Sequence, residues 1–375
     1  MSGNTLRLGR LFGIEVKLDY SWFIIFALVT WSLARQYFPM AHPGWSATVY
    51  WAMGALTALL FFTSVLAHEL AHSFVAQAQG TPVRDITLFL FGGAAHISEE
   101  PKSPRHEFLM ALAGPVTSLM IAGLFGLVWQ GSLTSNPLLH ALAGWLATIN
   151  LSLGLFNLIP GFPLDGGRVF RAIVWHITGN LQRGTAIAGG LGRFVAYGFI
   201  FWGVWQIFSG NWVNGLWIAF IGWFLENAAT ASVQQVALHQ WLTGHTVREV
   251  MMTDCPQLLG QLTLDVAVDQ VVLPSGKRCF PVIEQGQVQG LLTLHRIASA
   301  PRDQWATTRV QDVMIPLAEL KTVRPDEELV AVFERMAEED INQYPVLEAG
   351  NRRLLGIVAR DNVLTFLHTR AALRA

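Results

Sequence analysis

Long apolar stretches separated by short polar connections follow one another through the first 230 residues of the chain. A helix needs about 20 mainly apolar residues to cross the roughly 30 Å hydrocarbon core of a bilayer. Six stretches qualify or nearly do, at residues 19–38, 49–77, 107–129, 137–160, 185–208 and 211–229. The pattern therefore predicts a polytopic α-helical membrane region with about six transmembrane helices, surrounded by the lipid bilayer.

A seventh apolar segment, ITLFLFGGAAHI at residues 86–97, is too short to span a bilayer. At membrane depth, backbone N–H and C=O groups must find partners within the protein. We therefore predict a short membrane-associated β-hairpin that dips into the protein-lined interior. Gly92, Gly93 and His96 lie in this predicted hairpin.

Beyond residue 230 the apolar runs give way to a repeat. VREVM (247–251) recurs as VQDVM (310–314), and CFPVIEQGQVQGLL (279–292) recurs as QYPVLEAGNRRLLGIV (343–358). Each copy combines alternating strand patterns with an apolar helix. The repeat predicts one pseudo-symmetric α/β module made of two similar halves.

Composition supports this division into two regimes. The chain has 375 residues, of which 52% are hydrophobic and 14% charged, whereas an ordinary soluble domain carries about 25% charged residues. The formal net charge of -1 provides no basic face for phosphates, so no nucleic-acid partner is expected. The expected domains are a transmembrane domain at 1–230, a linker at 231–246, and the two copies at 247–302 and 303–375.

Lysine and arginine indicate the orientation in the membrane. They gather in the N-terminal tail and in the connections after the second and fourth predicted helices, while the opposite connections carry only Arg35. The positive-inside rule then places both termini and the repeat module in the cytoplasm. The two cysteines, Cys255 and Cys279, have no metal-ligand spacing and are expected to be reduced thiols of a cytosolic domain.

Ionisable side chains lie within the second predicted helix, where each costs on the order of 2.5 to 3.5 kcal/mol on insertion scales. In HELAH, residues 68–72, His68 and His72 are four residues apart. They project from one face of a helix at a spacing that can grip one metal ion. Glu69 is too close in sequence to be an easy third ligand but is placed to hold a water molecule. The alternative is a pair of interior histidines with structural hydrogen bonds.

A catalytic zinc site needs a third protein ligand and an open position. Asp165 is the next candidate, in NLIPGFPLDGGR at residues 157–168, where prolines and glycines must interrupt the helix. The predicted topology places this interruption and HELAH at the same cytoplasmic-side depth. The alternative is that Asp165 is a turn residue, since Asp-Gly is a common turn pair.

The motifs resemble those of the site-2 protease family of intramembrane zinc metalloproteases, over about residues 7–230. The matching segments are HELAH (68–72), FGGAAH (91–96), AGP (113–115) and FNLIPGFPLDGGR (156–168). The resemblance implies one zinc ion per chain, held by His68, His72 and Asp165, with Glu69 as the catalytic acid/base. It also implies cleavage within or next to a transmembrane helix of another protein, in a bacterial or archaeal cell membrane.

Two asparagines, Asn150 and Asn157, match polar positions of the family's fourth helix. A neutral amide can donate to a developing oxyanion without adding charge, so they are candidates for oxyanion or substrate binding, with an interhelical hydrogen bond as the alternative. A substrate helix must unwind before attack, and the hairpin around Gly92 and Gly93 could pair with it by strand addition. His96 is expected to line this region.

The repeated module resembles a pair of CBS domains, the cystathionine β-synthase type. Such pairs often bind adenine nucleotides through a hydroxyl and a ribose-binding aspartate. Here Thr293 is present but Arg296 occupies the usual aspartate position in the first copy, and in the second Asp361 is shifted by one from Asn362. Two functions of the CBS pair remain open. It could bind an adenine nucleotide through Thr293 and Asp361, or it could form a homodimer without any ligand.

CBS pairs also occur on ion channels and transporters, where intramembrane carboxylates mark ion paths. A CBS-gated channel or transporter is therefore the alternative function. Such proteins usually show discontinuous segments in two related halves, and this sequence shows no such internal symmetry. The leading hypothesis is an intramembrane zinc endopeptidase whose activity the CBS pair modulates.

Overall fold

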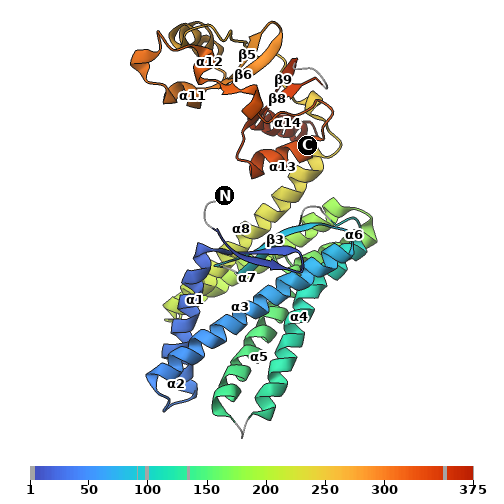
Figure 1. Cartoon of the computed structure of the whole chain (residues 1–375). Helices are drawn as coiled ribbons and strands as arrows, with labels where there is room; N and C mark the ends of the chain where they lie inside the picture. The colour runs from blue at the N-terminus through green and yellow to red at the C-terminus, as the bar shows by residue number, and fades with distance from the viewer. Residues whose placement is uncertain (1–4, 91, 98–100, 133–135, 349–352, 375) are drawn as a thin grey trace. The chain divides into compact units, whose positions relative to one another are not determined.

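The computed structural model describes residues 5–90, 92–97, 101–132, 136–348 and 353–374 (Figure 1). By its internal contacts the chain divides into two compact units, Met1–Val236 and Ala237–Ala375. The division falls inside helix α8 (Trp212–Leu242). The segment expected to link the domains, 231–246, is helical up to Leu242.

Five helices among the described residues are long and apolar enough to cross a membrane. They are α3 (Ala47–Ala78), α4 (Pro104–Gly131), α5 (Pro137–Asn157), α7 (Leu181–Phe208) and α8. Their N-termini are chemically marked, since side-chain oxygens at the cap positions of α3, α4, α5 and α7 accept hydrogen bonds from first-turn backbone N–H groups. Capping of this kind satisfies donors that the helix itself leaves unpaired.

The first predicted membrane helix is built differently from the other five. It begins as α1 (Tyr20–Ser32), passes through a π-helical segment (Leu33–Tyr37) and ends as α2 (Phe38–Ala41). Together the three segments are helical without a break over residues 20–41. At about 1.5 Å per residue this length is roughly 33 Å, close to the thickness of the hydrocarbon core.

A four-stranded sheet belongs to the same unit. Its order is β1 (Thr5–Leu11), β2 (Ile14–Asp19), β3 (Val83–Phe89) and β4 (Gly92–Ile97), with β2 and β3 parallel and the other pairs antiparallel. Strands β3 and β4 form the predicted hairpin. The two N-terminal strands were not predicted, although the alternation of buried Ile14, Val16 and Leu18 is typical of a half-buried strand.

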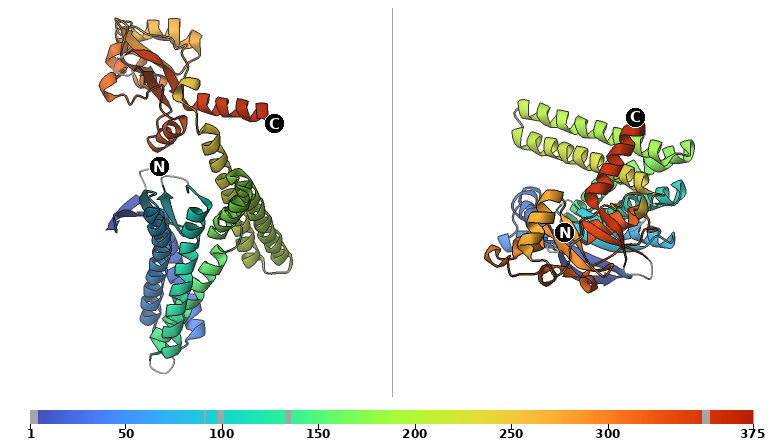
Figure 2. Two further views of the ribbon diagram at one scale, coloured as in Figure 1. Left: turned by 90° about the vertical axis from the view of Figure 1, so that its right-hand side faces the viewer. Right: turned by 90° about the horizontal axis from the view of Figure 1, so that it is seen from above.

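Helices α3, α4 and α5 run side by side (Figures 1 and 2). Buried apolar side chains of α3 and α5, such as Met53 and Leu146, share one core with Leu33 and Phe38 of the first helical segment. After α5 ends at Asn157, a loop leads to the short helix α6 (Asp165–Thr178), which packs against α4 and α7. The predicted interruption thus separates two helices, and Asp165 is the first residue of the second one.

The second unit contains one β-hairpin in each repeat. β5 (Cys279–Glu284) pairs with β6 (Gln287–Thr293), and β8 (Gln343–Leu347) pairs with β9 (Leu354–Ala359). The longer helices are α13 (Leu329–Glu338) and α14 (Arg360–Arg374); the short elements are α9 (Leu264–Ala267), α10 (Leu273–Ser275), α11 (Leu294–Ser299), α12 (Val310–Val313) and β7 (Ile315–Pro316). Each repeat has an apolar core to which the other contributes: the first core includes Val310 of the second copy, and the second includes Val247 and Val250 of the first. A bridge between Met252 and Ile357 joins the start of the first repeat to the second.

Candidate metal centre

Helix α3 carries both histidines of HELAH on its buried face. His68 is 4% and His72 5% exposed, and their ring centroids lie 4.8 Å apart with the ring planes at 77°. Because positions four apart on an α-helix share a face, the helix alone brings the two imidazoles together. Their Nε2 atoms are 3.2 Å apart.

The carboxylate of Asp165 arrives from α6. Its Oδ2 lies 3.0 Å from His68 Nε2 and 3.2 Å from His72 Nε2. Gly166 and Gly167, the next two residues of α6, pack on the backbone of the preceding loop, where an added Cβ would overlap Leu158 and Gly161. These two glycines therefore let α6 begin close enough to α3 for Asp165 to meet the histidines.

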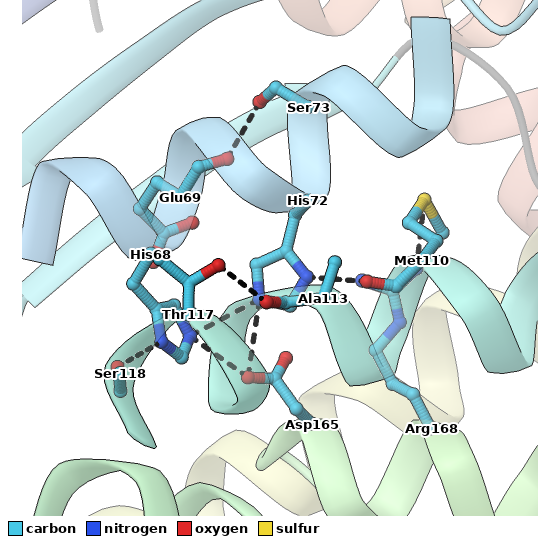
Figure 3. Close-up of polar contacts among 10 residues, drawn as sticks. All are labelled: His68, Glu69, His72, Ser73, Met110, Ala113, Thr117, Ser118, Asp165 and Arg168. Atoms are coloured by element: carbon cyan, nitrogen blue, oxygen red, sulfur yellow. Dashed lines mark hydrogen bonds and ion pairs between the residues drawn. The ribbon is translucent and has the colours of Figure 1, made fainter. Parts of the chain in front are cut away.

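Three ligand atoms converge on one point in this arrangement (Figure 3). Tetrahedral zinc with bonds of about 2.0 to 2.2 Å to nitrogen and oxygen separates its ligand atoms by roughly 3.3 Å. The observed separations of 3.0, 3.2 and 3.2 Å are close to this value. Two imidazole nitrogens and one carboxylate oxygen are also a donor set found in catalytic zinc sites. The residues present therefore fit a zinc ion.

Residues of helix α4 contact the Nδ1 atoms of both imidazoles. His68 Nδ1 lies 2.9 Å from the Oγ of Ser118, and His72 Nδ1 lies 2.7 Å from the carbonyl oxygen of Met110. Gly114 lies between these two positions on the helix, and a Cβ there would be 2.5 Å from His68 Nε2. Sequence reasoning missed these supports: the spacing of four puts residues 110, 114 and 118 on one face of a helix, but no local signal shows that this face meets the histidines.

Glu69 lies next to strand β4. A Cβ added to Gly93 would be 2.5 Å from Glu69 Cγ and 3.1 Å from its Oε1, so the strand backbone touches the side chain of this glutamate. Strand β4 is the last strand of the sheet and pairs only with β3 among the described residues. The structure thus places the glycine segment of the hairpin beside the predicted catalytic carboxylate.

The remaining residues predicted from the sequence occupy different positions in the fold. Asn150 is fully buried and donates to the Leu146 carbonyl of its own helix at 2.8 Å, which is a structural contact. Asn157 is the last residue of α5, and Gly92 begins β4. His96 lies in β4 opposite Asp85, while its side chain is outside the described part.

A buried ion pair near the centre was also missed. Glu107 of α4 is completely buried, and Arg171 of α6 donates to its Oε1 from Nε at 2.6 Å and also from Nη2. Buried charges of opposite sign are retained where each satisfies the other. The pair ties α6, and with it Asp165, to α4. One charged residue in each of two helices, 64 positions apart, carries no local sequence signal.

The second unit contains a cavity of about 220 Å³ between its two repeats. Its polar lining residues include Asp254, Lys277, Arg278, Gln343, Asp361 and Asn362. Thr293 instead caps α11, where its Oγ1 accepts from the Arg296 N–H. Of the two predicted nucleotide-binding residues, only Asp361 therefore lines this cavity.

Both cysteines also line the cavity of the second unit and are free thiols. Burial raises the pKa of the Cys279 thiol to about 12. The pKa of Cys255 is also raised by burial. A thiol is a nucleophile and a metal ligand only as the thiolate, so neither cysteine is activated for reaction at neutral pH.

Sequence comparison matches this chain to two families. The family described as Peptidase family M50 matches residues 56–134 and 127–198. The CBS domain family matches residues 310–369, which is the second repeat. The two segments matched to Peptidase family M50 contain HELAH and the Asp165 loop, respectively.

Two relatives match nearly the whole chain. "Putative zinc metalloprotease Rip3" of Mycobacterium tuberculosis is 36% identical over 363 residues, covering 96% of this chain and 92% of Rip3. The sll0528 protein of Synechocystis sp., named likewise, is 35% identical over 372 residues, covering 98% and 97%. The structure of the Site-2 Protease from Methanocaldococcus jannaschii is 29% identical with a TM-score of 0.41, covering 60% of this chain and 94% of that chain.

Proposed function

Because the chain belongs to peptidase family M50, the site-2 protease family of intramembrane zinc metalloproteases, we propose that His68, His72 and Asp165 hold one zinc ion and that Glu69 is the catalytic acid/base. The supporting observation is the convergence of two Nε2 atoms and one carboxylate oxygen within 3.2 Å of one another. The comparisons give no support for the alternative of a channel or transporter.

The chemistry follows from these four side chains. Bound zinc supplies a Lewis acid that polarises the substrate carbonyl and acidifies water. Glu69 accepts a proton from the attacking water as the water oxygen bonds to the carbonyl carbon. It then delivers that proton to the leaving nitrogen as the C–N bond breaks. One water is consumed, the products are a carboxylic acid and an amine, and no other reactant is needed.

The substrate is a segment within or next to a transmembrane helix of another membrane protein. A helix hides its backbone carbonyls in internal hydrogen bonds, so the segment must unwind before attack. The free edge of β4 offers backbone partners to such an unwound strand. Since Gly93 lies against Glu69, a strand added at this edge would pass beside the catalytic carboxylate.

Asn157 is our candidate for binding the developing oxyanion or the substrate strand. It ends α5 at the start of the loop that leads to Asp165, which is a position close in sequence to the ligand. A neutral amide can donate there without adding charge. Asn150 donates to the Leu146 carbonyl of its own helix, while its buried Oδ1 has no hydrogen-bond partner among the described residues, so Asn150 stays our second candidate for this role.

The protein is a multi-pass membrane protein, with several helices apolar enough to span the bilayer. We propose that both termini and the CBS module are cytoplasmic, on the distribution of lysine and arginine. With that orientation the carboxyl end of α3, which carries HELAH, lies at the cytoplasmic side. Water then reaches the metal centre from the cytoplasm.

For the CBS module we propose an adenine nucleotide as ligand and a second copy of the chain as partner. The cavity between the repeats combines Lys277 and Arg278, which suit phosphate, with Asp361 and Asn362, which suit ribose hydroxyls. Its volume of about 220 Å³ is smaller than that of most ligand sites, about 300 to 1,000 Å³. Binding would therefore require the two repeats to move slightly apart.

The test of the proteolytic assignment is Glu69→Gln, which removes the acid/base group but keeps the shape of the side chain. We expect cleavage to fall by about 100-fold or more, measured by comparing membrane-protein fragments in cells carrying the variant or the wild type. Zinc content and thermal unfolding should match the wild type, because Glu69 is not a ligand. Glu226→Gln in α8, whose carboxylate accepts from Thr230 of the same helix, is the matched control. Retained cleavage would overturn the role of Glu69.

A further inference from the structure

One face of α4 contacts the histidines of the candidate metal centre at three positions. Met110, Gly114 and Ser118 follow one another at intervals of four residues, so they share one side of the helix. Met110 and Ser118 each meet the Nδ1 atom of one imidazole, and Gly114 lies opposite the Nε2 atoms. Met110 and Ser118 meet the two imidazoles at Nδ1, on the side away from Asp165 (Figure 3), whereas Gly114 approaches the Nε2 atoms that also face Asp165.

The contact to His72 determines which of its nitrogens carries a proton. A backbone carbonyl oxygen can only accept a hydrogen bond, so His72 Nδ1 must be the donor in the 2.7 Å contact to Met110. In a neutral imidazole the other nitrogen, Nε2, then holds a lone pair. That lone pair faces Asp165 and His68, where a metal ion would bind.

The contact to His68 is different, because a hydroxyl can donate or accept. If Ser118 donated to Nδ1, the neutral ring would carry its proton on Nε2, which would point at Asp165 and block metal binding. We propose that Ser118 is a positioning residue of the metal centre: its hydroxyl accepts the Nδ1–H of His68 and keeps Nε2 free for the metal. This inference rests on the proposed function, since it requires His68 to be a ligand.

The hydrogen bond between Ser118 and His68 is buried, which strengthens its effect on the orientation of the imidazole. Ser118 is fully buried and His68 is 4% exposed, so bulk water does not compete directly for Nδ1. Gly114 adds a steric condition, because any side chain there would overlap His72 Nε2 and crowd His68 Nε2. The rings are thus held by hydrogen bonds at Nδ1 and by close packing near Nε2. Loss of such outer hydrogen bonds typically weakens metal binding by 10- to 100-fold.

The experiment measures zinc affinity of the purified full-length protein by competition with a chelator. We expect Ser118→Ala to bind zinc about 10- to 100-fold more weakly than the wild type. Ser64→Ala is the matched control: Ser64 is also buried, one turn before His68 on α3, but its hydroxyl bonds only the Leu60 carbonyl of its own helix at 3.0 Å. Its zinc affinity should stay within about twofold of the wild type.

A second measurement begins with the wild type alone, so its first part does not depend on a variant that folds. Long-range ¹H–¹⁵N spectra of the zinc-loaded protein should show protonated Nδ1 in both rings. In Ser118→Ala the His68 signals should move while those of His72 hold. A His68 that is protonated at Nε2 in the wild type, or equal zinc affinity in Ser118→Ala and the wild type, would overturn the inference. If the wild type binds no zinc at all, it is the proposed function that fails.

Discussion

Two glycines determine how closely backbone approaches the reacting side chains. Gly114 brings α4 against the Nε2 atoms of His68 and His72, and Gly93 brings β4 against Glu69. At both positions even one methyl group would have to displace a functional side chain or the element itself. Interiors are packed too densely to absorb such an overlap without a shift. Glycine at these positions therefore serves the geometry of the site.

Gly93→Ala tests the contact between β4 and Glu69. The new Cβ would lie 2.5 Å from Glu69 Cγ, so the carboxylate or the strand must move. A misplacement of about 1 Å can cost roughly 100-fold in rate, and we expect a fall in cleavage of at least tenfold with unchanged zinc content. Gly126→Ala in α4, where a Cβ meets open space, is the control. Wild-type cleavage by Gly93→Ala would show that β4 does not approach Glu69 in the working enzyme.

At the scale of elements, α6 decides whether the metal centre is complete. It is only 14 residues long, yet its first residue is Asp165 and its later turn carries Arg171, which pairs with Glu107 of α4. The first residue and the middle of this helix thus contact different neighbours: Asp165 meets the histidines of α3, and Arg171 pairs with Glu107 of α4. A helix held at two points along its first half positions one carboxylate better than a loop would.

Arg171→Met should therefore destabilise the membrane unit, because it leaves the carboxylate of Glu107 buried without its partner. Breaking a buried pair costs about 3 to 5 kcal/mol, and thermal unfolding in detergent should show a clearly lowered Tm. Combining Arg171→Met with Glu107→Leu should recover most of this loss, since two apolar side chains leave no unpaired charge. Arg183→Met, at an exposed position of α7, should change stability by no more than about 0.5 kcal/mol. An unchanged Tm in Arg171→Met would contradict the anchoring role.

At the scale of the whole molecule, one helix belongs to both units. Helix α8 starts as a membrane-type helix, and near its end Leu242 is completely buried in the apolar core of the second repeat. Helical backbone therefore runs from the membrane-type part of α8 to Leu242 of the second unit. A change inside the CBS module has a covalent path to the membrane unit that contains the metal centre.

Nucleotide binding is the prediction at this scale. ATP or AMP at 100 times its Kd should stabilise the protein by about 2.7 kcal/mol, seen as a raised Tm of the full-length chain. Asp361→Ala should remove the shift because Asp361 lines the cavity, while Thr293→Ala should keep it because Thr293 caps α11 outside the cavity. If neither nucleotide changes the Tm or the proteolytic activity, nucleotide sensing by this module is excluded.

The sequence by itself determined whatever depends on short windows of residues. Apolar runs of about 20 residues located the membrane helices, the repeat located strand segments in both copies of the second unit, and the spacing of His68 and His72 placed two imidazoles on one helix face. Asp165 was found because a run of prolines and glycines marks an interruption in any helix. Each of these signals is local, since it comes from the periodicity or the backbone preference of neighbouring residues.

Only the tertiary structure decided which distant groups meet. The parallel pairing of β2 with β3, the Glu107–Arg171 pair and the support of His68 by Ser118 each join residues that are 50 or more positions apart. The Met110 carbonyl is a backbone group that every residue possesses, so no letter of the sequence marks it. Such contacts arise from the way the helices and the sheet pack, and packing is a property of the whole fold rather than of any segment.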